Sequence, residues 1–330
     1  MRVKGAFKTI VIYLIFLAPH YCALADAGEN LPNEQDYAST IEDKKEAQTI
    51  EQGVFTKVIR ASAKQKSLGE FADHKIDTEC YGLGYRARID DTTFSIAAFA
   101  SRSKIVTHNK YKAEGYMGVM DGHLDVTPSI FVDGRLIFGQ GHVKAPNIQK
   151  IRGEIISYTK PKAKIFGANV FVGQDYLARA NLHLIPYIGL VSDSIFIKSY
   201  RKISHIPART YRNRGSAIVN TPKYIPSLNV QQTSSVLGIT VKHLRNIEDA
   251  ELTSEVHGSF ARNHGKNQEL TSFYRSSFAV SYLNPRASTY NAGGSMKFYK
   301  PGYELGIGYD ASFAKKFVAQ VYCLKVGLKL

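Results

Sequence analysis

The sequence predicts an all-β protein: a transmembrane, antiparallel, up-and-down β-barrel of about 12 strands with a short N-terminal helix. Three observations predict this class. Apolar and polar residues alternate along most of the chain after residue 78. The alternating segments run for about 10 to 14 residues, whereas soluble strands average five or six. Short turns alternate with long connections, as they do in barrels of outer membranes.

The N-terminus has the organisation of a secretory signal. Basic residues precede an apolar run over 9–17, which is too short to cross about 30 Å of hydrocarbon as a helix. Small residues then favour cleavage between Ala25 and Asp26, and a second site after Ala27 fits nearly as well. We therefore expect export and removal of residues 1–25.

Two segments are expected between the signal and the barrel. Residues 26–52 are polar and acid-rich, which is typical of a linker. Within 50–64 the apolar residues recur at helical spacing, so we expect the short helix there. The barrel domain, with this helix, is assigned to 53–330, and its first strand is expected somewhere within 63–76, where alternation is poor.

Period-two alternation defines the later strands. The segments that show it are 79–89, 93–101, 115–125, 130–138, 166–175, 182–190, 237–241, 256–260, 303–310 and 318–330. One face is apolar, and the other is rich in glycine and charge, as a crowded wet lumen requires. Short turns are expected at 90–91, 127–128, 179–180 and 246–247. Alternation alone also fits a soluble sandwich or propeller, but the strand length and the 20 Tyr and 17 Phe favour a membrane barrel.

Charge and cysteine content limit the possible functions. The formal net charge of +15 predicts attraction to anionic surfaces, and in an exported chain lipopolysaccharide or host polyanions are better candidates than nucleic acid. Only Cys80 and Cys323 follow the signal, so no disulfide framework or cysteine-based metal site is predicted. Both fall on the lumenal face, where a disulfide is one alternative and two separate buried thiols are the favoured one.

Candidate polar sites are few. Asp121, His123 and Asp125 share one strand face, but a metal site would need ligands from other elements, and lining of a polar lumen is the simpler interpretation. No nucleophile motif is recognisable. We therefore predict no catalytic residue, no metal, no cofactor and no enzymatic activity.

Two basic loops are the better functional lead. The first is expected over 142–164 and the second over 198–223, where tyrosines are interleaved. The residues of the second loop assigned to polyanion binding are Lys198, Arg201, Lys202, Arg209, Arg212 and Arg214. Binding to phosphates of lipopolysaccharide or to sulfated host glycans is the functional interpretation, and a solvated surface loop is the alternative.

Taken together, these segments resemble the β-barrel translocator domain of autotransporters. The resemblance lies in YGLGYRARIDDTTFSIA (81–97), LIPYIGL (184–190) and YELGIGYDAS (303–312), and it spreads over roughly 45–330. It implies a twelve-stranded barrel with a helix in the pore, which would be the helix expected at 50–64, preceded by a secreted passenger. Here the passenger is expected to be missing or vestigial within 26–52.

The resemblance also assigns an assembly signal. The family usually ends in Phe, whereas this chain has Leu330, which with Leu328 is expected on the outward face of the last strand. The absence of an Asn-Asn dipeptide gives no support to self-cleavage inside the barrel.

The expected function is a surface-exposed translocator or membrane anchor in the bacterial outer membrane. The expected partners are outer-membrane lipids, lipopolysaccharide, the barrel-assembly machinery and host polyanions, with no nucleic acid. Two alternatives remain at this point: a small outer-membrane channel or adhesin with basic loops, and a soluble secreted all-β binding protein.

Overall fold

The computed structural model describes residues 50–66, 74–106, 110–144, 149–151, 154–158, 162–207, 218–225, 227–264 and 288–330. Every regular element in these ranges is a β-strand. Residues 1–49 lie outside them, and so do the predicted signal peptide, its cleavage site at Ala25 and Asp26, and most of the predicted linker.

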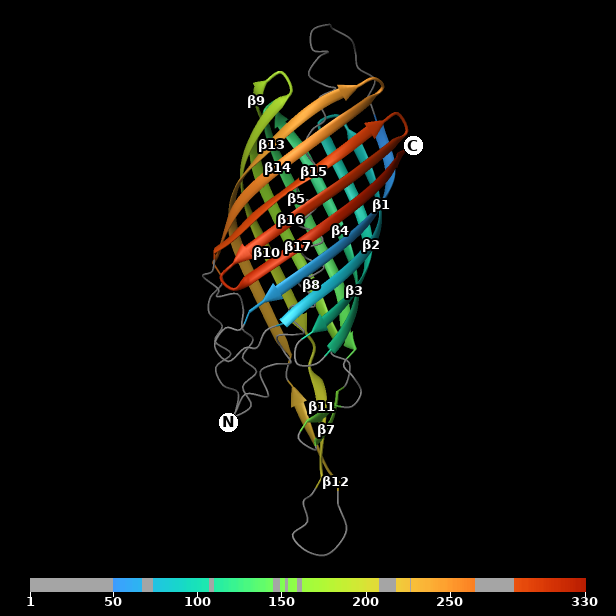
Figure 1. The fold of residues 1–330 in the computed structure, drawn as a ribbon, viewed down its shortest axis with the longest axis vertical. Coiled ribbons are helices and arrows are strands. Elements are labelled where there is room, and N and C mark those ends of the chain that lie inside the picture. Colours follow the sequence, from blue (N-terminus) through green and yellow to red (C-terminus); the bar gives the residue numbers. More distant parts are fainter. Residues whose placement is uncertain are drawn as a thin grey trace, which may run out of the picture.

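Twelve antiparallel strands form a closed barrel (Figure 1). They are β1 (Ile50–Gln65), β2 (His74–Ile89), β3 (Thr92–Val106), β4 (Lys110–Thr127), β5 (Ile130–Lys144), β8 (Lys162–Gln174), β10 (Leu182–Ile197), β13 (Leu228–Ile247), β14 (Ala250–Asn263), β15 (Ser288–Lys300), β16 (Tyr303–Ala314) and β17 (Phe317–Lys329). Each strand pairs with the next one around the wall, and β17 pairs with β1, so no edge is left open. The predicted fold class and strand number are confirmed.

The two ends of the barrel differ. Two-residue turns join β2 to β3, β4 to β5, β13 to β14 and β15 to β16, all at the end where β1 begins and β17 finishes, which we call the short-turn end. Asp90 and Glu248 open two of these turns with φ of 50° and 51°, the left-handed conformation that a tight hairpin needs. The predicted turns near 90, 127 and 246 are thus correct to within two residues. The opposite end, the long-loop end, carries the long connections.

The described residues also form five short strands. β9 (Tyr176–Arg179) pairs with β10 at the short-turn end. The other four are β6 (Gln149–Ile151), β7 (Glu154–Tyr158), β11 (Tyr200–Pro207) and β12 (Ile218–Ile225), and they form a separate sheet. This sheet, which we call the projecting sheet, extends beyond the long-loop end (Figure 1). It is built from the β5–β8 and β10–β13 connections, in which the sequence indicates only loops.

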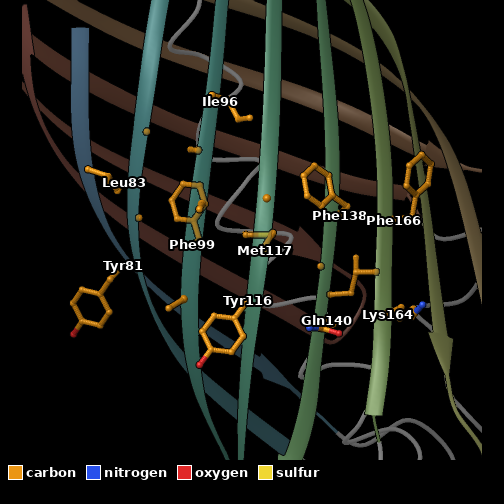
Figure 2. Close-up of a pocket in the computed structure, with 18 of the residues that line it drawn as sticks. Tyr81, Leu83, Ile96, Phe99, Tyr116, Met117, Phe138, Gln140, Lys164 and Phe166 are labelled. Carbon is orange, nitrogen blue, oxygen red and sulfur yellow. The ribbon is translucent and has the colours of Figure 1, made fainter.

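The outward face of the wall is apolar. Leu83 on β2 is 64% exposed, and Phe138 on β5 and Phe166 on β8 are exposed on the same outer face of the wall, farther around the barrel (Figure 2). The predicted outward residues of β2, β5, β8, β10, β13, β16 and β17 are the exposed apolar ones, which confirms the facing assignment. Such exposure would be costly in water but is stable in lipid, and closure satisfies the backbone without water. Within the described ranges, no helix is both long and apolar enough to span a membrane.

The predicted helix over 50–64 is wrong, and so is the expected first strand within 63–76. Residues 50–65 form β1, which pairs with β2 and β17 along its length. The apolar residues Ile50, Val54 and Val58 recur every four residues. This spacing fits a helix, with about 3.6 residues per turn, and it also fits a strand, in which every second residue lies on the same face. β1 is also apolar toward the lumen, where Phe55 and Ile59 are buried, so its alternation is hidden in the sequence.

Candidate functional site in the barrel interior and at the long-loop end

Ion pairs line one side of the lumen. Arg135 Nε on β5 donates to Asp121 Oδ1 on β4, and Ser95 Oγ on β3 donates to Asp121 Oδ2 at 3.2 Å. His123 has Asp133 Oδ1 at 2.7 Å from Nδ1 and Asp125 Oδ1 at 3.1 Å from Nε2. A doubly protonated imidazole satisfies both carboxylates as a donor.

These contacts show which partners the three candidate metal ligands, Asp121, His123 and Asp125, have in the structure. Asp121 is engaged by Arg135, while His123 and Asp125 contact each other, so the three residues act as wall groups. Within the described part of the chain, no group of three or more His, Cys, Asp and Glu side chains is placed to hold a metal ion.

The opposite side of the lumen carries a second network. Lys297 Nζ on β15 lies 3.2 Å from Glu255 Oε1 on β14, and Ser295 Oγ donates to Glu255 Oε2 at 3.0 Å. His257 lies 2.6 Å from Asp310 on β16. Glu255 and Lys297 are both fully enclosed, so each needs the other to offset the loss of water.

A third cluster closes the seam between the first and last strands. Glu304 Oε1 on β16 lies 2.9 Å from Lys325 Nζ on β17, and Glu304 Oε2 lies 3.7 Å from Arg86 on β2. Lys325 Nζ also lies 5.1 Å from the ring centroid of Phe55 on β1. Because β16, β17, β1 and β2 are consecutive around the wall, one carboxylate links strands on both sides of the β1–β17 junction.

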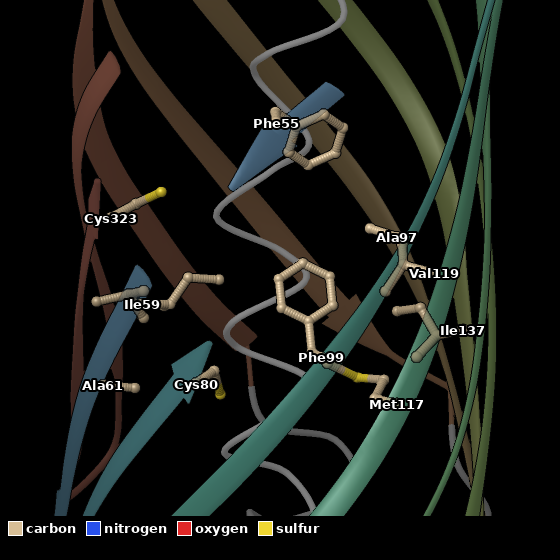
Figure 3. Packing of buried hydrophobic residues seen from close by; sticks show 11 residues of the cluster. Phe55, Ile59, Ala61, Cys80, Ala97, Phe99, Met117, Val119, Ile137 and Cys323 are labelled. Carbon is tan, nitrogen blue, oxygen red and sulfur yellow. The ribbon is translucent and has the colours of Figure 1, made fainter. Parts of the chain in front are cut away.

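An apolar cluster lies on the inner face between these charged groups (Figure 3). Its members are Phe55, Ile59, Ala61, Cys80, Ala97, Phe99, Met117, Val119, Ile137, Val321 and Cys323. The alternation pattern does not predict this cluster, but the consecutive apolar residues of β3 and β4, at 96–100 and 116–120, indicate that the inner face is apolar there. The lumen is therefore partly apolar.

The two cysteines belong to this cluster. Cys80 on β2 and Cys323 on β17 are both paired in register with Ile59 on β1, one on each side of it. They are buried and are not joined in a disulfide, so the favoured alternative of two separate lumenal thiols is confirmed.

Aromatic side chains lie over glycines on the inner wall. A Cβ atom added at Gly82 would collide with the ring of Phe99, one at Gly84 with Phe55, and one at Gly173 with Phe131. Because glycine has no side chain, a large ring can lie flat against the neighbouring strand, and the ring fills the space that the missing side chain leaves.

The two predicted basic loops are brought together. β7, from the first loop, pairs with β11, from the second, with Lys202 in register with Tyr158. Arg201 and Lys202 lie in β11, and Lys198 directly follows β10. Arg209, Arg212 and Arg214 lie outside the described residues. Lys162 and Lys164 belong to β8 on the barrel wall, not to a loop, which corrects the predicted extent of the first loop.

The predicted assembly residues lie at the end of β17. Leu328 is paired in register with Val54 on β1 and with Tyr303 on β16, and it is 55% exposed on the outward face. Leu330 is exposed as well, and its backbone N–H donates to the carbonyl of Gln52 at 2.9 Å.

Comparison with known proteins gives one set of relatives in sequence. No family model matches the chain. Outer membrane protein B of Rickettsia rickettsii is 25% identical over 292 residues, which cover 83% of this chain and 17% of that protein. Outer membrane protein B of Rickettsia prowazekii is 25% identical over 297 residues, with 84% and 17% covered. The chain thus spans about a sixth of the length of these relatives.

Solved structures give the same answer for the fold. The translocator domain of the autotransporter NalP from Neisseria meningitidis superposes with a TM-score of 0.65 at 12% identity, covering 95% of this chain and 98% of that one. The transport unit of the autotransporter AIDA-I from Escherichia coli gives 0.53 at 9% identity, covering 100% and 99%.

The β domain of the Bordetella autotransporter BrkA gives a TM-score of 0.56 at 10% identity, covering 84% of this chain and 98% of that one. The resemblance predicted from the sequence is confirmed: the chain has the fold of autotransporter translocator barrels, it is similar in sequence to outer membrane protein B, and both likenesses support a place in the bacterial outer membrane.

Proposed function

We propose that this chain acts as a translocator or membrane anchor whose long-loop end faces the cell exterior. The observation that carries the proposal is the closed barrel with an apolar outer wall and a lumen of ion pairs. The ion pairs described in the lumen join neighbouring strands and thereby stabilise the wall, an arrangement that suits a membrane-embedded support better than an enzyme. A cleaved signal before Asp26 and insertion by the barrel-assembly machinery complete the proposal.

The first prediction tests the location and orientation of the barrel. The chain should fractionate with outer membranes and should run faster on gels before heating than after it, because a closed barrel has no strand edge for detergent to attack. Protease added to intact cells should cut within the projecting sheet and leave the short turns whole. Recovery of a soluble monomer from the periplasm, or cleavage at the short turns alone, would contradict the proposal.

A second function is favoured by the projecting sheet. Pairing of β7 with β11 joins the two basic segments in one sheet, in which Arg201 and Lys202 are consecutive residues of β11. We propose that the projecting sheet binds polyanions, either lipopolysaccharide phosphates or sulfated host glycans. Guanidinium groups form paired hydrogen bonds with phosphate or sulfate oxygens, and this favours arginine-rich surfaces for such ligands.

The second prediction separates the two halves of the basic segment. Changing Lys198, Arg201 and Lys202 to Ser should lower heparin binding by intact cells, as should changing Arg209, Arg212 and Arg214 to Ser. Both losses should shrink as salt rises, because exposed charges are screened beyond about 8 Å at physiological ionic strength. Unchanged heparin binding in both triple variants, with normal barrel levels, would show that the cluster is only solvated surface.

A further inference from the structure

An open groove of about 1320 Å³ lies on the outward face of β2, β3, β4, β5, β8 and β10 (Figure 2). Small outward residues form its floor, Ala98 and Ala100 on β3, while the ring of Phe138 on β5 lies over Gly118 on β4. Larger side chains flank them, Leu83 on one side and Phe138 on the other. The volume exceeds the roughly 300–1,000 Å³ of pockets for drug-sized ligands, so the groove fits a long flexible molecule.

The strand register divides the groove into two rows. The row nearer the short-turn end is Leu83, Ala98, Gly118, Phe138 and Phe166, and it is apolar throughout. The row nearer the long-loop end is Tyr81, Ala100, Tyr116, Gln140 and Lys164, which ends in polar groups. The groove is thus amphipathic along the membrane normal, and Figure 2 shows Gln140 and Lys164 together at one end of it.

Cations dominate the polar end. Lys164 lies in β8 between Gln140 on β5 and Phe196 on β10, and Lys162 is the next outward residue of the same strand. Both side chains are exposed, and among the described residues no carboxylate forms an ion pair with either one. The nearby Glu114 is instead held at 3.9 Å by Arg102 and at 4.0 Å by His142. Positive charge therefore stands beside an apolar groove, at the depth where tyrosines mark a membrane interface.

We propose that this groove binds one membrane lipid with an anionic phosphate headgroup, from the leaflet at the long-loop end. Its acyl chains lie over Ala98 between Leu83 and the ring of Phe138, and Lys162 and Lys164 bind the phosphate. Gln140 supplies a neutral donor to the headgroup. The inference rests on the proposed function, because it requires the outer wall to face lipid.

The chain contains no Trp, so a single introduced Trp reports on the groove without background. Tyr116→Trp places the reporter in the polar row, and Tyr290→Trp, on the outward face of β15, is the matched control. The purified barrel is reconstituted into phosphatidylcholine vesicles that hold a minor fraction of brominated phosphatidylglycerol or, in parallel, brominated phosphatidylcholine. We expect the anionic lipid to quench Tyr116→Trp preferentially, with an enrichment of about five-fold per lysine, and to show no preference at Tyr290→Trp.

Two variants test the two halves of the site. Lys162→Gln with Lys164→Gln should abolish the preference at Tyr116→Trp, whereas the control pair Lys64→Gln with Lys66→Gln should leave it intact. Ala98→Phe keeps both lysines but fills the floor, and it should abolish the preference as well. Equal quenching by the two lipids, or a preference that survives either groove variant, overturns the proposal. Absence of quenching by both lipids at both reporters would instead show that the barrel had not inserted, which contradicts the proposed function.

Discussion

At the residue scale, the two faces of the clearly alternating strands were predictable, and the packing on the inner face was not. Alternation identifies Leu83 and Leu237 as outward residues, and the structure exposes both. By contrast, the flat packing of Phe99 over Gly82 depends on which strands are neighbours and on their register. A sequence shows that glycines are frequent on the lumenal face, but it does not show which ring covers each one.

Gly189 on β10 is a position where backbone approach requires glycine. A Cβ atom there would lie 2.6 Å from the backbone oxygen of Val170 and would also collide with the ring of Phe171. We predict that Gly189→Ala lowers the free energy of unfolding by about 1–3 kcal/mol, as overpacking of a tight site does. Urea unfolding in vesicles, followed by gel mobility, measures the effect. Gly122→Ala is the control, because its Cβ would have no atom within 4 Å, and equal losses in the two variants would contradict this account.

At the scale of elements, the sequence predicted those strands that have one polar face. β16 and β17 alternate cleanly: β17 was placed to within one residue at each end, and β16 was predicted to start at the right residue but to end four residues early. β15 was not identified, because its outward residues include Ala292 and Gly294 and its inward ones are small or polar. The projecting sheet was hidden for another reason: β7 and β11 are far apart in sequence, and each is too short to show a period.

The corrected β1 makes a specific prediction about the seam. Thr56 on β1 and Val326 on β17 are paired in register and both face outward. In a Cys80→Ser, Cys323→Ser background, we expect Thr56→Cys with Val326→Cys to form a disulfide, because paired antiparallel residues have Cα separations of about 4.5–5.5 Å, within the range that disulfides require. A mobility shift on non-reducing gels measures it. Thr56→Cys with Leu324→Cys, offset by two residues, should cross-link less, and equal cross-linking would contradict the register.

At the scale of the whole molecule, stability depends on joining the two ends of a long chain segment. β1 and β17 lie about 250 residues apart in the sequence, and their pairing closes the barrel only after all the other strands are in place. Backbone pairing between them is reinforced from the lumen by Glu304, which contacts both Lys325 and Arg86. On the lipid side, Leu328 lies at the same junction, in register with Val54 of β1. The end of β17 therefore both closes the barrel and faces the membrane.

This position gives the assembly residues a testable role. Leu328 and Leu330 are exposed on the outward face, so replacing both with Asp puts two charges at the lipid boundary of the closing strand. The cost per charge falls from a few kcal/mol at the bilayer centre to about 0–1 kcal/mol near the interface. We therefore expect the finished barrel to lose little stability but its assembly to fail, because the closing strand must enter the membrane with both charges.

The measurement is the amount of heat-modifiable barrel in outer membranes, with urea unfolding of whatever barrel is recovered. Lys329→Gln, which removes a charge between the two leucines and its contact with Glu51 at 3.6 Å, is the control and should assemble normally. If the double variant reaches the membrane at wild-type levels, the end of β17 carries no assembly signal. If the double variant assembles normally but unfolds at a much lower urea concentration than the wild type, the two leucines stabilise the finished barrel instead.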